Sequence, residues 1–173
     1  MYFRANGEVI VMHVHEYMFH TVRGVTLSLE RFTGQPILVV NTASESQYAP
    51  QLGQLQKLYQ EYMPSGLVVL AMPCNDFDEK EPLEGDELDA HYWDVHRVNF
   101  PVTEKLEITG PHSHPFWNSL REEYSNDMLP QGNFYKYLFG RDGELLEHWP
   151  SDIEPDDSGV HHQIERNVSS WCL

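Results

Sequence analysis

Two nearly continuous apolar runs constrain the fold of this chain more than any other feature. They are "ILVVN" at residues 37–41 and "GLVVLAM" at residues 66–72. Strands that are buried on both faces of a sheet have this composition. Between the runs, leucines at helical spacing follow Pro50, a residue that suits the first turn of a helix. The segment therefore predicts a βαβ unit with a right-handed crossover.

The rest of the chain adds strands and helices around this unit. Alternation in "VTLSLERF" predicts an earlier strand, and "GRDG" carries the Asp-Gly pair of a hairpin. Further elements are expected as helices at 85–93 and 114–123, strands at 98–102, 133–139 and 144–149, and a last helix capped by Ser158, with Val160, Ile164, Val168 and Trp171 as its apolar stripe. This order predicts an α/β fold, a mixed sheet with helices on both faces. We expect a single domain over residues 1–173, with residues 1–16 as an N-terminal extension.

Charge excludes several classes of partner. The formal net charge is −16, from 27 acidic and 11 basic residues, which disfavours nucleic acid, anionic membrane surfaces and polyanionic substrates. No apolar stretch approaches the roughly 20 residues of a membrane span, and the N-terminus lacks a signal-peptide pattern. We therefore expect a cytoplasmic protein that binds neither membrane nor nucleic acid.

Four collinear segments resemble the glutathione peroxidase family. "VVNTASESQYAPQLGQLQKLY" is similar to the signature in which a strand ending Asn-x-Ala-Ser leads into the nucleophile and a helix. "LVVLAMPCNDFDEKEP" resembles the second signature, Phe-Pro-Cys-Asn-Gln-Phe followed by Gln-Glu-Pro. "FPVTEKLEITGPHSHPFW" and "GNFYKYLFGRDGELLEHWP" are similar to the family's His-Pro segment and its Trp-Asn-Phe-x-Lys-Phe-Leu segment. The resemblance implies a thioredoxin-like fold and thiol-dependent hydroperoxide reduction.

The residues that carry this activity in the family are mostly replaced here. The resemblance places the peroxidatic cysteine or selenocysteine, the glutamine, the tryptophan and the asparagine of the family on Ser46, Lys80, Gly132 and Asn133, respectively. Gln47 and Ala49 stand where the family has glycine and threonine. The segment at 85–97 also lacks the cysteine that resolves the sulfenic acid in thiol-dependent members.

A serine cannot perform the chemistry of a peroxidatic cysteine. A thiol can be ionised near neutral pH and can be oxidised reversibly to a sulfenic acid, whereas a hydroxyl is hardly ever ionised and has no comparable oxidation products. We therefore predict a glutathione peroxidase-like protein with lost or severely impaired activity. It would act as a binding module, whose pocket around Ser46, Lys80, Asn75 and Asn133 holds a small polar ligand or whose acidic face meets a basic protein.

Other interpretations stay open at this point. A weakly active thiol peroxidase could use Cys74, or the natural protein could carry cysteine at position 46. A hydrolase serine at Ser46 would need a histidine base and an orienting acid, and no G-x-S-x-G elbow is present. A disulfide between Cys74 and Cys172 is not favoured, since a chain with two cysteines and no secretory signal gives little support for one.

Neither a metal nor a cofactor is expected from the residue spacing. "HVH" at 13–15 would place two imidazoles on one face of a strand, but no cysteine or carboxylate follows at zinc-like spacing. The acidic run "DFDEKEPLEGDELD" at 76–89 is not spaced as a calcium loop. Because this run lies beside the predicted pocket, we expect the anionic thiol glutathione to be disfavoured.

Overall fold

A four-stranded mixed sheet forms the centre of the protein in the computed structural model, which describes residues 6–7 and 12–168. Strands β3 (Ile37–Thr42) and β4 (Val68–Pro73) are parallel, and Ile37 is paired with Val68. Helix α1 (Gln51–Tyr62) connects them and is followed by a short 3₁₀ helix, η3 (Met63–Ser65). The predicted βαβ unit is confirmed.

The other half of the sheet is antiparallel. Strand β5 (Lys136–Phe139) lies beside β3, and β6 (Leu145–Trp149) completes the order β4-β3-β5-β6. In the turn between β5 and β6, Gly143 has a φ of 87°, a left-handed conformation that glycine adopts without steric cost. The hairpin prediction is therefore confirmed.

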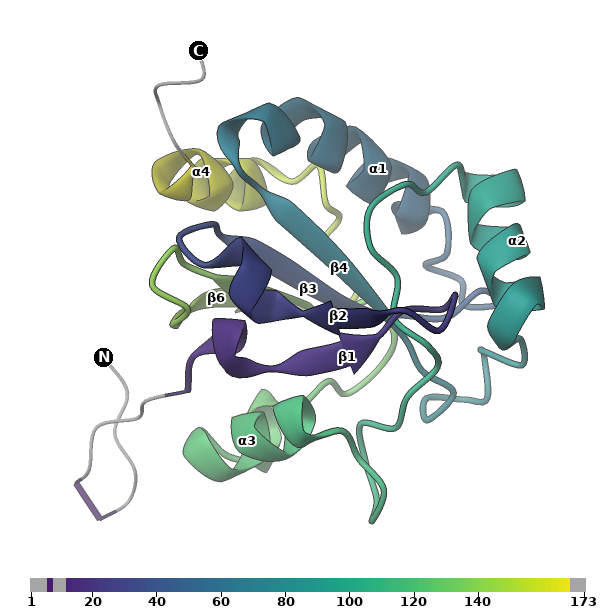
Figure 1. Ribbon diagram of the computed structural model, residues 1–173, viewed down its shortest axis with the longest axis horizontal. Helices are drawn as coiled ribbons and strands as arrows, with labels where there is room; N and C mark the ends of the chain where they lie inside the picture. The colour runs from purple at the N-terminus through teal and green to yellow at the C-terminus, as the bar shows by residue number, and fades with distance from the viewer. Residues whose placement is uncertain (1–5, 8–11, 169–173) are drawn as a thin grey trace.

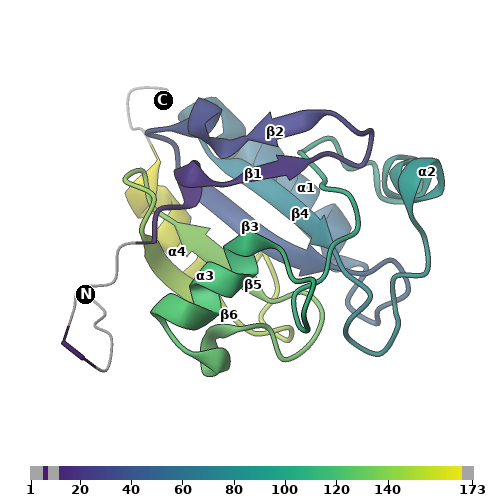
Figure 2. The same cartoon turned by 60° about the horizontal axis from the view of Figure 1, so that its bottom comes forward.

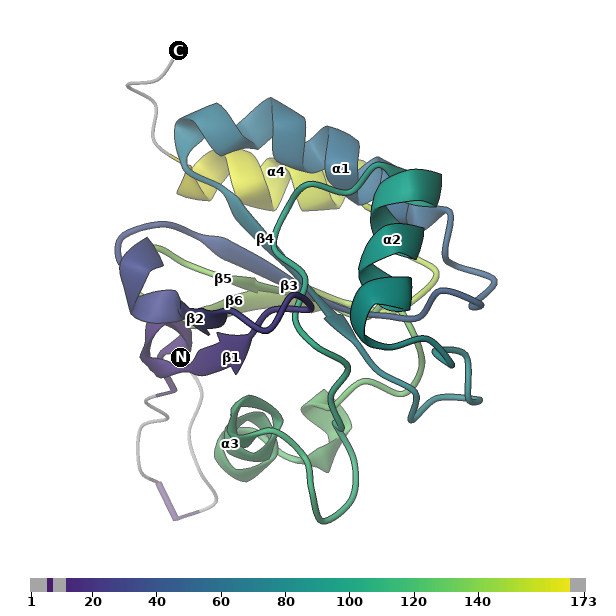
Figure 3. The ribbon, with the colours of Figure 1, turned by 45° about the vertical axis from the view of Figure 1, so that its right-hand side comes forward.

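Alternate side chains of the sheet enter two separate hydrophobic cores. Helices α1 and α4 (Ser158–Asn167) cover one face, and α3 (Pro115–Glu123) covers the other together with the hairpin β1 (Met18–His20) and β2 (Thr26–Ser28) (Figures 1 and 3). Helix α2 (Gly85–His96) lies apart, near the carboxyl ends of β3 and β4 (Figure 2). The predicted mixed sheet with helices on both faces is thus observed.

Three predicted details are wrong. Residues 98–102 form no regular strand and make only an isolated bridge between Val102 and Ala71, because Pro101 has no N–H to donate to a ladder. The strand predicted in "VTLSLERF" ends at Ser28 and continues as the 3₁₀ helix η2 (Leu29–Phe32). The cap of α4 is Asp157, whose carboxylate accepts a hydrogen bond from Gly159 N–H at 2.8 Å, and not Ser158.

The N-terminal segment is part of the domain from residue 12 onward. Met12 and Val14 are buried in the core on the α3 side, so residues 12–16 do not extend from the fold as predicted. Residues 14–16 form a 3₁₀ helix, η1 (Val14–Glu16), rather than the strand that would align two histidines. Instead, His13 Nδ1 hydrogen-bonds to the carbonyl of Asp142, and His15 Nε2 hydrogen-bonds to the carbonyl of Gln35.

Within the described part of the chain, helices are too short or too polar to cross a membrane. In the last helix, Val160 and Ile164 are buried as predicted and Val168 is half-buried, whereas Trp171 lies outside the described residues. The 3₁₀ helix η4 (Asn126–Met128) follows α3 and leads into the segment before β5. That segment, together with the loops after β3 and β4, builds the site.

Candidate functional site

Three loops meet where β3 and β4 end and β5 begins. Asn41, near the end of β3, holds the loop before β5: its Nδ2 donates to the carbonyl of Gly132 at 2.9 Å, and its Oδ1 accepts from Tyr135 N–H at 2.9 Å. The third loop follows β4 and approaches through Glu45 N–H, which donates to the carbonyl of Lys80 at 2.9 Å. The loops at 43–50, 74–82 and 131–135 therefore form one connected region.

Ser46 lies in the turn between β3 and α1. Its side chain is largely buried, with 8% of the residue exposed, and its Oγ accepts a hydrogen bond from Tyr48 N–H at 3.1 Å. The carbonyl of Ser46 accepts from Ala49 N–H at 3.0 Å, which begins the turns that lead into α1. No histidine or carboxylate of the described residues hydrogen-bonds to this hydroxyl. The arrangement is that of a serine stabilising a turn.

A buried carboxylate holds this turn in place. Glu81 is fully buried, and its side chain accepts from Ser44 N–H at 2.9 Å and from Ser44 Oγ–H at 2.7 Å. The Tyr92 hydroxyl of α2 lies 3.1 Å from Glu81 Oε2 and 2.8 Å from Thr42 Oγ1. Burial, with the charge of Glu81 next, raises the pKa of Tyr92 well above its usual value. Glu81 thereby ties the loop after β4 and α2 to the turn of Ser46.

Asn75 completes this hydrogen-bonded frame, by which we mean Asn41, Ser44, Asn75, Glu81 and Tyr92. The Asn75 Oδ1 accepts from Glu81 N–H at 2.9 Å, so the two ends of the 75–81 loop are clamped together. Sequence reasoning missed Glu81 and Tyr92 as site residues. The available signal was the Glu-Pro pair inside the second matching segment, but a run of surface acids surrounded it.

Lys80 contributes its backbone to the site and not an enclosed side chain. Its carbonyl contacts the Ser46 turn through Glu45, while the residue itself is exposed. The two preceding residues, Asp78 and Glu79, have φ values of 60° and 52°, in the left-handed region that non-glycine residues adopt infrequently. This tight turn brings the loop back toward Glu81.

Gly132 and Asn133 lie in the loop at 131–135, which leads into β5. A Cβ atom at Gly132 would meet Ser151 Oγ at 3.4 Å and no other contact within 4 Å, so the position is open. The Asn133 Nδ2 donates to the carbonyl of Phe77 at 3.2 Å, and this acceptor fixes the orientation of the amide. Its buried Oδ1 has no hydrogen-bond partner among the described residues. One of the two N–H donors of the Asn133 amide is thus used within the protein.

Comparisons with known proteins match this geometry. A family model described as glutathione peroxidase matches residues 14–121, well over half of the chain. The chain is 30% identical to a glutathione peroxidase of Lactococcus lactis subsp. cremoris over 148 residues, covering 84% of this chain and 94% of the relative. It belongs to the glutathione peroxidase family.

Solved structures agree with this membership. Trgpx in apo form superposes with a TM-score of 0.69 and 26% identity, covering 90% of this chain and 97% of its own. The thioredoxin-like superfamily protein SPOA0173 superposes with a TM-score of 0.63 at 13% identity, covering 91% of this chain and 96% of its own, and so shares the fold. The predicted thioredoxin-like fold is confirmed.

Cys74 was considered above as an alternative catalytic group. It follows β4, and its side chain lies in the core on the α3 side. It is fully buried, and its Sγ accepts from Asp76 N–H at 3.4 Å. Burial above all raises the pKa of this thiol to about 12, so a thiolate hardly forms near neutral pH. Cys172 lies outside the described residues.

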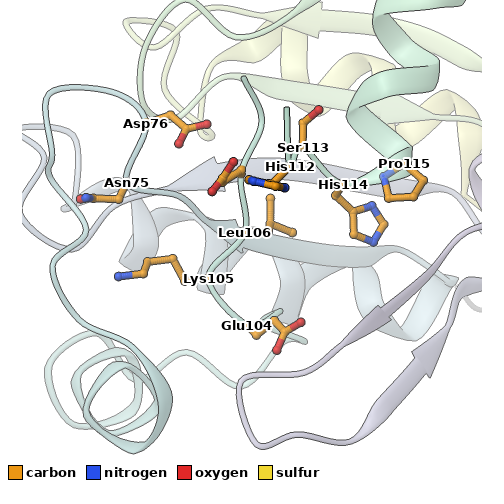
Figure 4. Close-up of a pocket in the computed structure, with 10 residues that line it drawn as sticks. Asn75, Asp76, Glu104, Lys105, Leu106, His112, Ser113, His114 and Pro115 are labelled. Carbon is orange, nitrogen blue, oxygen red and sulfur yellow. The ribbon is translucent and has the colours of Figure 1, made fainter. Parts of the chain in front are cut away.

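Beside the frame lies a polar cavity of about 590 Å³ (Figure 4). Asn75 and Asp76 form one wall, and residues 104–107 and 112–115 form the other. Of the predicted site residues, Asn75 lines this cavity, whereas Ser46, Lys80 and Asn133 are not among its lining residues. This cavity is therefore not the single pocket that was predicted around all four residues.

The charge of the cavity is mainly negative. Asp76, Glu104 and Glu107 line it together with one lysine, Lys105. Asp76 is partly committed to the fold, since its Oδ2 accepts from Ile108 N–H at 2.7 Å and from the next residue. Among the residues that the structure describes, no three histidine, cysteine or acidic side chains gather as a metal site requires.

Proposed function

We propose that this member of the glutathione peroxidase family does not reduce hydroperoxides by the thiol chemistry of the family and acts as a binding module. The observation that carries the proposal is the serine at the peroxidatic position. Its hydroxyl is largely buried and accepts a backbone hydrogen bond within a turn. Such a group has neither the ionisation nor the oxidation chemistry that peroxide reduction requires.

The surroundings of Ser46 support the same proposal. Lys80 replaces the glutamine of the family and is exposed, and Gly132 replaces the tryptophan and has no side-chain donor. The Nδ2 of Asn133 is bonded to the carbonyl of Phe77. Each donor missing from a transition-state site costs about 3 kcal/mol, and about 1.4 kcal/mol changes a rate tenfold. These replacements would lower the rate further, beyond the loss of the thiolate.

A binding role agrees with the polar cavity beside the frame. Its carboxylates, Asp76, Glu104 and Glu107, favour a neutral or cationic polar ligand and disfavour the anionic thiol glutathione. A basic protein is the second class of partner that the net charge of −16 favours. A cytoplasmic location stays a prediction.

The alternative, a weakly active thiol peroxidase, has two forms. Use of Cys74 is disfavoured because the thiol is fully buried and its pKa is raised to about 12. A natural cysteine at position 46 would instead place a thiol in the turn that leads into α1, where helix-terminal amides can lower a thiol pKa. The two forms are separable by substitution.

The test is hydroperoxide consumption, coupled to either a thioredoxin or a glutathione reducing system. The unaltered protein is assayed beside Ser46→Cys and Cys74→Ala. Ser125→Cys serves as a matched control, because it adds a thiol at an exposed position away from Ser46. We expect background rates for the unaltered protein, for Cys74→Ala and for Ser125→Cys.

Two outcomes decide between the alternatives. Turnover by the unaltered protein that disappears in Cys74→Ala would overturn the proposal and identify a relocated thiol. Turnover by Ser46→Cys alone would show that the frame still supports the chemistry and that the serine accounts for its loss. The gene sequence at codon 46 then establishes whether serine is the natural residue.

A further inference from the structure

A second cavity, of about 620 Å³, lies between α2 and the hairpin of β1 and β2. We call it the α2 groove. Its walls are the hairpin turn at 21–25, the helix α2 and residues 98–102. Four aromatic residues line it: Tyr59, Tyr92, Trp93 and Phe100. A predominantly apolar cavity of this size is within the range of ligand and peptide-anchor sites.

Two large apolar side chains remain exposed on facing walls of the α2 groove. Val25 of the hairpin turn is 62% exposed, and Trp93 of α2 is 47% exposed. Tryptophan and tyrosine are the residues most enriched among those that carry the binding energy of protein interfaces. An exposed tryptophan beside a cavity thus has the properties of a contact residue rather than of a core residue.

An ion pair joins the two walls at the rim. Arg23 of the hairpin turn donates from Nε to Asp89 Oδ2 of α2 at 2.9 Å. Of the residues described as lining the groove, these two are the charged ones, and they neutralise each other. The groove itself therefore presents apolar surface without an unpaired charge.

The surface around the α2 groove is acidic. On α2, Asp86 is exposed and lies one helical turn before Asp89, on the face that lines the groove. Glu87 and Asp94 are exposed on the other face of the helix, and Arg97 at its end is an exposed cation. These carboxylates lie outside the cavity, so a ligand that used both the apolar walls and the acids would extend beyond it. A peptide segment does this, whereas a compact small molecule within the groove does not.

We propose that the α2 groove docks a basic peptide segment of a partner protein. An aromatic or aliphatic side chain of the segment inserts between Val25 and Trp93. Flanking lysine or arginine side chains are attracted by Asp86 at the rim and by the net charge of −16. The inference rests on the proposed function as a binding module and names its partner class. The groove is separate from the polar cavity beside Asn75, although Tyr92 belongs to both the groove and the frame.

Fluorescence anisotropy of labelled peptides tests this proposal on the full chain. The probe is a short lysine- and arginine-rich peptide with a central Leu-Phe pair. One matched peptide replaces that pair by Ser-Ser, and another replaces every basic residue by glutamate. We expect the basic Leu-Phe peptide to bind most tightly, with an affinity that falls as salt is added, because exposed charges are screened.

Substitutions then locate the binding surface. Trp93→Ala and Val25→Ser, on opposite walls, are each expected to weaken binding of the Leu-Phe peptide about tenfold or more. Leu146→Ala is the matched control, because Leu146 is an exposed apolar residue of β6, outside the groove lining. Both wall positions are exposed, so the variants should fold, which circular dichroism verifies.

Equal binding of the Ser-Ser and Leu-Phe peptides would overturn the proposal, because the attraction would then be net charge alone. Unchanged affinity in both wall variants, or preference for the acidic peptide, would overturn it as well. The peroxidase assay is independent of these results. Hydroperoxide turnover with groove-dependent binding would defeat the proposed function alone, and background turnover without such binding would defeat the docking proposal alone.

Discussion

The frame and the positions that the family resemblance assigns to catalysis meet at the same three loops, yet they differ in what they retain. Side chains of the frame, such as Asn41 and Glu81, are buried and hydrogen-bonded to backbone groups of neighbouring loops. At the positions that the family resemblance assigns to catalysis, Ser46 has a hydroxyl, and Gly132 has no side chain. We propose that the region kept its architecture while the groups that would perform the family's chemistry were replaced.

This difference follows from what each group stabilises. A buried carboxylate that loses its partners costs several kcal/mol, so the frame is constrained by folding itself. A catalytic thiol contributes little to folding, and a serine in a turn even adds a backbone hydrogen bond. Loss of activity is therefore compatible with an unchanged fold, and the two kinds of residue should respond differently to perturbation.

The largest expected effect concerns the reactivity of Cys74, which directly precedes the frame residue Asn75. In a Cys172→Ser background, we expect the thiol to react with Ellman's reagent at least about a thousandfold more slowly than an unperturbed thiol near neutral pH. The pKa, raised from 9.0 to about 12, reduces the thiolate fraction by that factor. Urea should restore full reactivity. Prompt reaction in the folded protein would show that this part of the site carries accessible thiol chemistry.

The next largest effect is the loss of the frame carboxylate. Glu81→Leu removes the acceptor of Ser44 N–H, of Ser44 Oγ–H and of the Tyr92 hydroxyl. We expect the free energy of unfolding, measured by urea denaturation, to fall by about 3 kcal/mol. Glu45→Leu is the matched control at an exposed position of the same turn, with an expected change within about 0.5 kcal/mol. Similar effects of the two substitutions would remove the distinction between the frame and the surface.

The contrast between Glu81 and its neighbours also marks what the sequence can predict. Apolar runs at 37–41 and 66–72 identify β3 and β4, because a strand buried on both faces is nearly continuously apolar. The family segments then locate Ser46, Lys80 and Asn133. One buried acid within a run of exposed acids has no local pattern, since its burial depends on contacts with distant residues.

Two other features depend on contacts that no short segment contains. The α2 groove forms where the hairpin turn at 21–25 meets α2 and residues 98–102, which lie far from that turn in the chain. Its third wall, residues 98–102, was predicted to be a strand, but Pro101 leaves only an isolated bridge. Likewise, the two histidines at 13 and 15 bond to backbone carbonyls of separate loops.

A third prediction concerns His114, the structural histidine of the matched His-Pro pair. Its Nδ1 accepts from Phe116 N–H at 3.1 Å, its Nε2 lies 3.0 Å from the carbonyl of Met18, and its ring stacks on Phe19. Burial lowers the pKa of His114. The unfolded chain therefore binds a proton that the folded protein resists, and stability falls as pH drops below about 6.5.

The measurement is the free energy of unfolding at about pH 5 and at about pH 7.5. One proton changes this free energy by at most about 1.4 kcal/mol per pH unit. His114→Asn should lessen the acid sensitivity, because asparagine can cap a helix without titrating in this range. An identical pH dependence in the variant would show that other groups account for the loss of stability in acid.

The smallest expected effect is at Gly132, and it tests the catalytic side of the comparison. The backbone there is outside the left-handed region, and an added Cβ would meet Ser151 Oγ at an ordinary 3.4 Å. Gly132→Ala should therefore leave the free energy of unfolding within about 0.5 kcal/mol or raise it slightly, because alanine restricts the unfolded chain. Gly143→Ala is the matched control: its φ is 87° and its Cβ would approach His15 Nδ1 to 3.0 Å, so we expect a loss of about 1 kcal/mol or more. A comparable loss of unfolding free energy in Gly132→Ala would mean that the fold requires this glycine. Like Glu81, the position would then be constrained by the structure.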